Sequence, residues 1–138
     1  MILSLDTNAL IELVNGRRQE VRGAFQAALA AGDEMLVSVL VAHEMRFGAQ
    51  FSGRSSEVES VEDVLARFPI IPFTEEDAAG ATRVRLSLER GGRRIGAMDM
   101  MIAGQAINRG WAVVTANVHE FGRVTGLRVI DWTVAEST

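Results

Sequence analysis

The chain has 138 residues, a net charge of −4 and no cysteine, and all fourteen of its basic residues are arginine. Its length predicts one domain, residues 1–138, that buries enough surface to fold unaided. Without cysteine the chain has no disulfide, thiolate metal site or thiol nucleophile, and without lysine it has no P-loop or Schiff-base chemistry. The acidic balance argues against a domain that coats nucleic acid non-specifically.

The first third of the chain alternates short apolar runs with helical patterns. Ile2–Leu5 is an apolar run that predicts a buried strand. Leu10–Ala31 carries apolar side chains at mostly helical spacing, with a break near Gly16. Met35–Val37 predicts a second apolar strand.

The middle of the chain continues this alternation. Ser38 can cap a helix that runs to about Ala49. A Gly/Ser-containing loop is expected over Phe51–Ser56 and a helix over Glu57–Phe68. The two residues Ile70–Ile71, flanked by prolines, predict a short edge strand.

The last third adds two helices and two strands. Thr74–Asp77 forms a capping-box pattern that opens a helix to about Glu89. A second helix is predicted over Ala97–Arg109, followed by strands at Ala112–Val114 and Arg128–Ile130. Strands separated by helices imply parallel pairing with right-handed crossovers, so we predict an α/β fold, a three-layer α/β/α sandwich with a small, mainly parallel sheet.

Polar side chains from four separate segments should meet at one edge of this sheet, because ligands of open parallel sheets gather at the carboxyl ends of the strands. Asp6 follows the first strand directly, and the helix after the second strand carries another acid. The four residues are Asp6, Glu44, Asp99 and Asn117.

Glu44 and Asp99 lie in otherwise apolar stretches, where a buried carboxylate is costly unless something pairs with it. Three acids in one crevice repel one another, and a divalent cation removes that penalty; oxygen ligands select Mg²⁺ or Mn²⁺. Taken singly, Asp6 could as well cap a helix and Asp99 could as well stabilise a helix N-terminus. Their joint placement favours a metal site.

Four blocks of sequence resemble the PIN-domain ribonucleases and, within them, the VapC toxins of bacterial toxin–antitoxin pairs. The blocks are Leu5–Asn8 (LDTN), Ser38 with Glu44–Gly48 (EMRFG), Ile95–Ala103 (IGAMDMMIA), and Val114–Asn117 (VTAN) with Glu120–Phe121 and Gly126–Trp132 (GLRVIDW). They span nearly the whole chain, and their order and spacing make the resemblance specific. Two positions depart from the family pattern: many PIN nucleases have an aspartate at the place of Asn117, and Gly104 replaces a common alanine.

The resemblance implies a single PIN-like nuclease domain that hydrolyses RNA phosphodiester bonds with Mg²⁺, for which Mn²⁺ substitutes. Asp6, Glu44 and Asp99 would hold the metal, and the same acids with Asn117 would be the catalytic residues.

Three further residues could support these side chains. Thr7 and Thr115 could hydrogen-bond the carboxylates or a metal-bound water, although capping of the strand ends is an equally good interpretation. Glu120 lies just beyond Asn117 and is assigned to the same supporting role. His43, beside Glu44, is interpreted as a partly buried structural histidine.

Substrate contacts are expected from arginines, which bind phosphate bidentately. Arg90, Arg93 and Arg94 lie in the loop before the Asp99 helix and are the RNA-binding candidates. The resemblance further implies a structured RNA target such as a tRNA or rRNA loop, a VapB-type antitoxin and a homodimer. The Phe47–Phe51 region could contact such a partner or belong to the core.

Localisation and rival functions complete the expectations. No stretch has the length and pattern of a membrane span or a signal peptide, so we expect a soluble, cytoplasmic protein without a membrane partner. A haloacid-dehalogenase-type phosphatase and a phosphoryl-receiver domain both need a lysine that is absent. Two alternatives stay open, a catalytically weak PIN-like domain that serves as a protein-interaction module and a nuclease of single-stranded DNA.

Overall fold

The described part of the chain, residues 1–134 of a computed structural model, is built around a five-stranded parallel sheet. The spatial order of the strands is β3-β2-β1-β4-β5. The chain therefore adds strands on both sides of the central strand, as in other doubly wound folds. The strands are β1 (Ile2–Leu5), β2 (Glu34–Ser38), β3 (Ile70–Ile71), β4 (Ala112–Val114) and β5 (Val129–Ile130).

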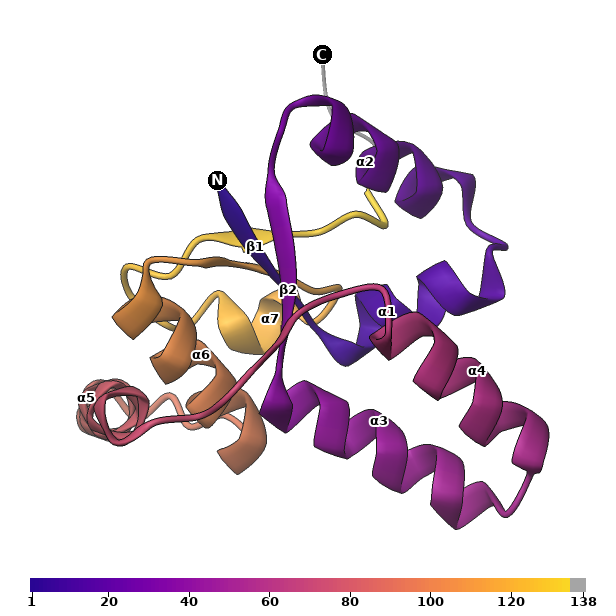
Figure 1. The fold of residues 1–138 in the computed structure, drawn as a ribbon. Helices are drawn as coiled ribbons and strands as arrows, with labels where there is room; N and C mark the ends of the chain where they lie inside the picture. The colour runs from indigo at the N-terminus through magenta and orange to yellow at the C-terminus, as the bar shows by residue number, and fades with distance from the viewer. Residues whose placement is uncertain (135–138) are drawn as a thin grey trace.

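Helices cover both faces of the sheet. In Figure 1, α1 to α4 lie to the right of β2, and α5 and α6 lie to its left. This arrangement follows from right-handed crossovers, because the chain first moves outward through β2 and β3 and then returns to β4. The helices are α1 (Thr7–Asn15), α2 (Gln19–Ala30), α3 (Val39–Ser52), α4 (Ser55–Leu65), α5 (Glu75–Arg90), α6 (Ala97–Arg109) and α7 (Val118–Phe121).

The two central strands are buried on both faces. Leu3 and Leu5 of β1 are 1% and 0% exposed, and Val113 and Val114 of β4 are each 0% exposed. Strands covered by helices on both sides read as continuous apolar runs, which is the pattern that marked them in the sequence. β1 pairs with β4 so that Leu5 lies opposite Val114, which brings the residues that follow these strands to the same edge.

Most predicted elements are confirmed. β1, β3, β4 and α6 have the predicted bounds, and Gly16, with φ of 61°, ends α1 where the break was expected. Ser38 caps α3 by accepting a hydrogen bond from the Leu40 amide, and Thr74 and Asp77 form the predicted capping box of α5. The α/β/α sandwich with a parallel sheet is also confirmed.

Other details were wrong. The loop expected over Phe51–Ser56 is almost absent, because α3 continues to Ser52 and α4 begins at Ser55. Gly53 adopts φ of 72°, so a left-handed residue reverses the chain where a longer loop was expected. The helix predicted over Glu57–Phe68 starts at Ser55 and ends at Leu65.

The short helix α7 was missed, and the strands predicted at Met35–Val37 and Arg128–Ile130 differ by a residue at one or both ends. A four-residue helix is too short to show a hydrophobic period. Within the described residues, no helix combines the length and hydropathy that crossing a bilayer requires.

Candidate active site

The first acid lies at the carboxyl edge of the sheet, between β1 and α1. Asp6 occupies the N-cap position of α1 and is 6% exposed, and its peptide N–H donates to the Val114 carbonyl at 2.9 Å. Its Oδ2 accepts a hydrogen bond from Thr115 Oγ1 at 2.8 Å. Burial raises the pKa of Asp6, while the bonds from Thr115 and the Thr7 backbone act in the opposite direction.

A second group of polar side chains lies at the same edge, where α6 begins and β4 ends. Asn117 Nδ2 donates to Asp99 Oδ2 and to Glu120 Oε2, each at 3.2 Å. Asp99 lies in the first turn of α6 and Glu120 in α7. The Asn117 amide therefore holds together the carboxyl groups of Asp99, 18 residues before it, and Glu120, three residues after it.

The carboxyl groups of Asp99 and Glu120 act on each other through a hydrogen bond. Burial, the hydrogen bond with Glu120 and the charges of Asp6, Glu120 and Glu44 together raise the pKa of Asp99 to about 7. The same bond lowers the pKa of Glu120, helped by Asn117, the Gly96 amide and the nearby Arg123 charge. Of the two carboxyl groups, Asp99 therefore takes up a proton more readily.

Glu44 approaches this cluster from α3, on the other side of Asp6. Its side chain is half-buried, and burial followed by the Asp6 charge raises its pKa, whereas the His43 charge lowers it. His43 itself is exposed, so its interpretation as a partly buried histidine was wrong.

The two threonines differ in their contacts. Thr115 is 1% exposed; its hydroxyl donates to Asp6 and accepts from the Asn117 amide at 3.0 Å, so it ties two parts of the edge together. Thr7 Oγ1 is buried and has no hydrogen-bond partner within residues 1–134. A buried hydroxyl without a partner, next to a buried carboxylate, fits a site that takes a polar ligand.

These donors suit a hard divalent cation. The oxygens come from carboxylates, an amide and hydroxyls, which is the set that Mg²⁺ and Mn²⁺ prefer. In the part of the chain that the structure describes, no three His, Asp or Glu side chains are yet arranged to hold an ion. Burial and the neighbouring acids raise the pKa of Asp99, a penalty that a bound cation would relieve.

The three arginines that were predicted to bind RNA have different surroundings. Arg94 lies 3.9 Å from Glu89, and Arg90 ends α5. Arg93 lines a surface cleft with His119 and Arg123, two residues to which the sequence drew no attention. All three arginines are exposed.

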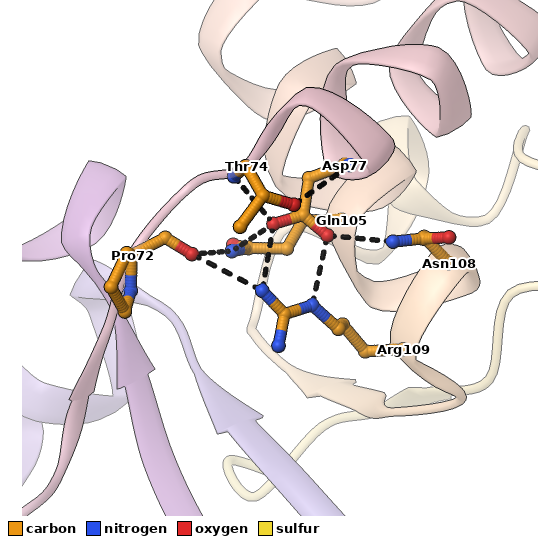
Figure 2. A network of polar contacts seen from close by, with 6 residues as sticks. All are labelled: Pro72, Thr74, Asp77, Gln105, Asn108 and Arg109. Atoms are coloured by element: carbon orange, nitrogen blue, oxygen red, sulfur yellow. Dashed lines mark hydrogen bonds and ion pairs between the residues drawn. The ribbon is translucent and has the colours of Figure 1, made fainter.

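A second buried acid was recognised only as a cap. Asp77 is 0% exposed and receives five hydrogen bonds of 2.8 to 3.2 Å, which Figure 2 shows, from the Thr74 amide, Gln105, Asn108 and two nitrogens of Arg109. Burial by itself would raise the pKa of Asp77, but these donors hold it far below its usual range. The network joins α5 to the end of α6 opposite Asp99, so it positions the helix that carries the candidate site.

The model of the PIN domain matches residues 3–127 of the chain. This chain belongs to the PIN-domain family. A similar protein of Shigella flexneri, named tRNA(fMet)-specific endonuclease VapC, is 37% identical over 132 residues, which cover 93% of this chain and 96% of that protein. The protein of the same name from Salmonella typhimurium is 32% identical over 129 residues, with the same coverage.

Solved structures agree with this membership. The structure of DNA-bound VapBC from Salmonella typhimurium contains a chain that superposes with a TM-score of 0.86 and 31% identity, covering 96% of this chain and 98% of that one. Among PIN-domain proteins the chain therefore belongs with the VapC ribonucleases, and it is a nuclease. The acids and the amide described above are the polar side chains of this PIN domain that meet at the carboxyl edge of its sheet.

Proposed function

We propose that this PIN-domain nuclease is a metal-dependent endoribonuclease toxin that cleaves structured RNA and is neutralised by a VapB-type antitoxin. Mg²⁺ is the proposed cofactor, and Mn²⁺ is expected to substitute for it. The observation that carries the proposal is the pairing of Asp99 and Glu120 by the Asn117 amide, with Asp6 near enough for its charge to help raise the pKa of Asp99 to about 7. Neighbouring carboxyl groups, one of which has a raised pKa, are suited to bind a divalent cation in place of a proton.

The residues of the chain have separate tasks in this proposal. Asp6, Asp99 and Glu44 would hold the cation, which when bound acidifies water and neutralises charge on the phosphate. Thr115 keeps the Asp6 carboxylate oriented, and Asn117 keeps Asp99 beside Glu120. Hydrolysis adds water across the bond between phosphorus and the 3′ oxygen, leaving a 5′-phosphate and a 3′-hydroxyl end.

The names of relatives support the choice of substrate and partner. The Shigella and Salmonella proteins are named for cleavage of tRNA(fMet), so a tRNA is the first substrate to try. The Salmonella structure is of a VapBC complex, which supports an antitoxin partner for this chain. An rRNA loop is the second substrate class.

A homodimer is proposed on a different observation. Phe47 and Phe51 of α3 are 62% and 82% exposed, and their rings stack with centroids 5.7 Å apart. Exposed aromatic pairs of this kind are typical of interfaces rather than of free surfaces. A strict monomer in light scattering at micromolar concentration would contradict the dimer.

The test is cleavage of an initiator tRNA and of an rRNA stem–loop by the purified protein, with Mg²⁺, with Mn²⁺ and with EDTA. We expect cleavage that requires metal and falls by more than about 100-fold in Asp99→Asn, because the substitution removes a charged ligand. Asp63→Asn is the matched control, since Asp63 is an exposed carboxylate of α4. Cleavage that survives both EDTA and Asp99→Asn would contradict the assignment.

The same experiments test the two alternative functions, a protein-interaction module and a nuclease of single-stranded DNA. If neither RNA is cut and Mn²⁺ binds equally to wild-type protein and Asp99→Asn, the chain is an interaction module. If single-stranded DNA is cut faster than either RNA, the substrate class is wrong while the site stands.

A further inference from the structure

A second hollow in the surface lies beside the candidate active site and is basic where that site is acidic. Its volume is about 510 Å³. The helix α7 belongs to both places, because His119 lines the hollow and the next residue, Glu120, belongs to the candidate active site. Its lining residues are Gly92, Arg93, Val118, His119, Gly122 and Arg123.

The guanidinium of Arg123 is held in place by two neutral acceptors. Its Nη1 donates to the Arg94 carbonyl at 2.7 Å, and its Nη2 lies 2.9 Å from His119 Nε2. Arginine has only donors, so His119 must accept this bond through the lone pair of Nε2. Neither acceptor carries a negative charge, so these two bonds orient the cation, and the carboxyl group that its charge acts on is Glu120 of the candidate active site.

The cleft brings two arginines together in one hollow. Arg93 and Arg123 both line it, and neither forms an ion pair with a carboxylate within residues 1–134, whereas their neighbour Arg94 lies 3.9 Å from Glu89. A chain of net charge −4 that leaves two cations together in one hollow presents a local site for an anion. A fixed guanidinium fork binds phosphate oxygens bidentately, and an exposed second arginine can close on the same group.

We propose that this cleft binds a backbone phosphate of the RNA, one that flanks the phosphate at the candidate active site, with Arg93 and Arg123 as its ligands and His119 as a positioning residue. The inference rests on the proposed function for the identity of the substrate. Just past the end of α7, the peptide N–H of Arg123 donates to the Glu120 carbonyl at 3.1 Å, so an RNA held in the cleft is aligned with the carboxylates.

The test measures binding apart from cleavage. Fluorescence anisotropy of a 5′-labelled tRNA stem–loop is recorded in EDTA, with the full chain and over a series of salt concentrations. We expect Arg123→Ala and Arg93→Ala each to weaken binding several-fold and to reduce the slope of log K against log salt by about 1.

Arg67→Ala is the matched control, because Arg67 is exposed, precedes β3 and therefore lies at the opposite, amino edge of the sheet. It removes the same charge and should change the affinity less than twofold. His119→Ala should weaken binding, whereas His119→Gln, which keeps an acceptor for Arg123, should restore it. A merely structural role of His119 would give equal losses with both variants.

The outcomes separate the two proposals. Equal affinities of Arg93→Ala, Arg123→Ala and Arg67→Ala, with wild-type protein binding RNA, would overturn the cleft and leave the proposed function intact. Absence of RNA binding by the wild-type protein would overturn both. Because Arg93 is exposed, its variant keeps the proposal testable if Arg123→Ala folds poorly.

Discussion

Two acids that lie at opposite ends of α6 have opposite environments. Asp99 belongs to α6, and Asp77 contacts its other end from α5. Asp99, in the first turn of α6, lies among other carboxyl groups, and its pKa rises to about 7. Asp77 contacts the last two turns of α6, and burial there is outweighed by hydrogen bonds, the strongest from Arg109, that push its pKa down. One acid is short of positive partners and the other is saturated with donors.

This contrast separates a place for a ligand from a place that holds the fold. A carboxylate whose lone pairs all accept hydrogen bonds from the protein has none left for a ligand. An acid with a raised pKa binds a proton that a cation can displace. The Asp77 network can therefore be expected to matter for stability, and the Asp99 cluster for cation binding and activity.

The largest effect on stability is expected at Asp77. Asp77→Asn should lower the free energy of unfolding by about 3 kcal/mol, because it leaves Arg109 without its anion and turns two acceptors into one. Urea unfolding at pH 7 measures this. The exposed acid Asp63 supplies the control, as Asp63→Asn should stay within about 0.5 kcal/mol of the wild type.

The loss of stability in Asp77→Asn should depend on pH. The folded pKa of Asp77 is depressed, so its contribution is present above the unfolded pKa of about 3.9 and is lost as the pH falls through the folded value. The gap in stability between wild type and Asp77→Asn should therefore narrow from pH 6 to pH 3. A gap that stays constant would mean that packing, not charge, sets the effect.

A smaller loss is expected midway along α6, at Gly104. A Cβ at this position would lie 2.4 Å from the backbone N and Cα of Ala81 in α5, so Gly104→Ala should force the helices apart and cost about 2 kcal/mol. Gly23→Ala, where a Cβ meets nothing within 4 Å, should instead stabilise the protein by about 0.5 kcal/mol. Thermal unfolding of both variants would show whether α5 and α6 are as tightly opposed as their glycines indicate.

The smallest effect has the opposite sign. Asp99→Asn should stabilise the metal-free protein at pH 8 by about 1 kcal/mol, a modest value because the half-exposed site is screened by solvent. The folded pKa of Asp99 is raised, so wild-type stability declines as the pH rises from about 4 to about 7, and the advantage of the variant should be much smaller at pH 5 than at pH 8. Melting in EDTA at both pH values is the measurement, and a variant less stable than wild type at pH 8 would contradict the repulsion among the acids.

Prediction from sequence succeeded where a local pattern carries the information. The apolar runs marked β1 and β4, and Thr74 with Asp77 marked the start of α5. It failed where the deciding contact is distant or the element is short. The four residues of α7 show no period, and nothing near Arg123 in sequence indicated that it would bond the carbonyl of Arg94.

The acids were predicted to meet, but their mutual contacts were not. Glu120 was expected only to support the others, whereas its carboxyl group acts on that of Asp99 and accepts a hydrogen bond from the Asn117 amide. Asp77 was expected to cap a helix, and its further donors come from residues 28 to 32 positions away. Both kinds of contact depend on the rotation and separation of packed helices.

The sequence by itself determined the family, the order of the strands and helices and the edge at which the polar residues emerge. Hydrophobic periodicity, caps and glycines are local, and a parallel sheet with right-handed crossovers leaves few ways to arrange them. Only the tertiary structure decided which carboxylates are saturated and which are not. That distinction depends on donors brought together from distant segments within about 3 Å, a distance that side-chain packing sets and that no local pattern encodes.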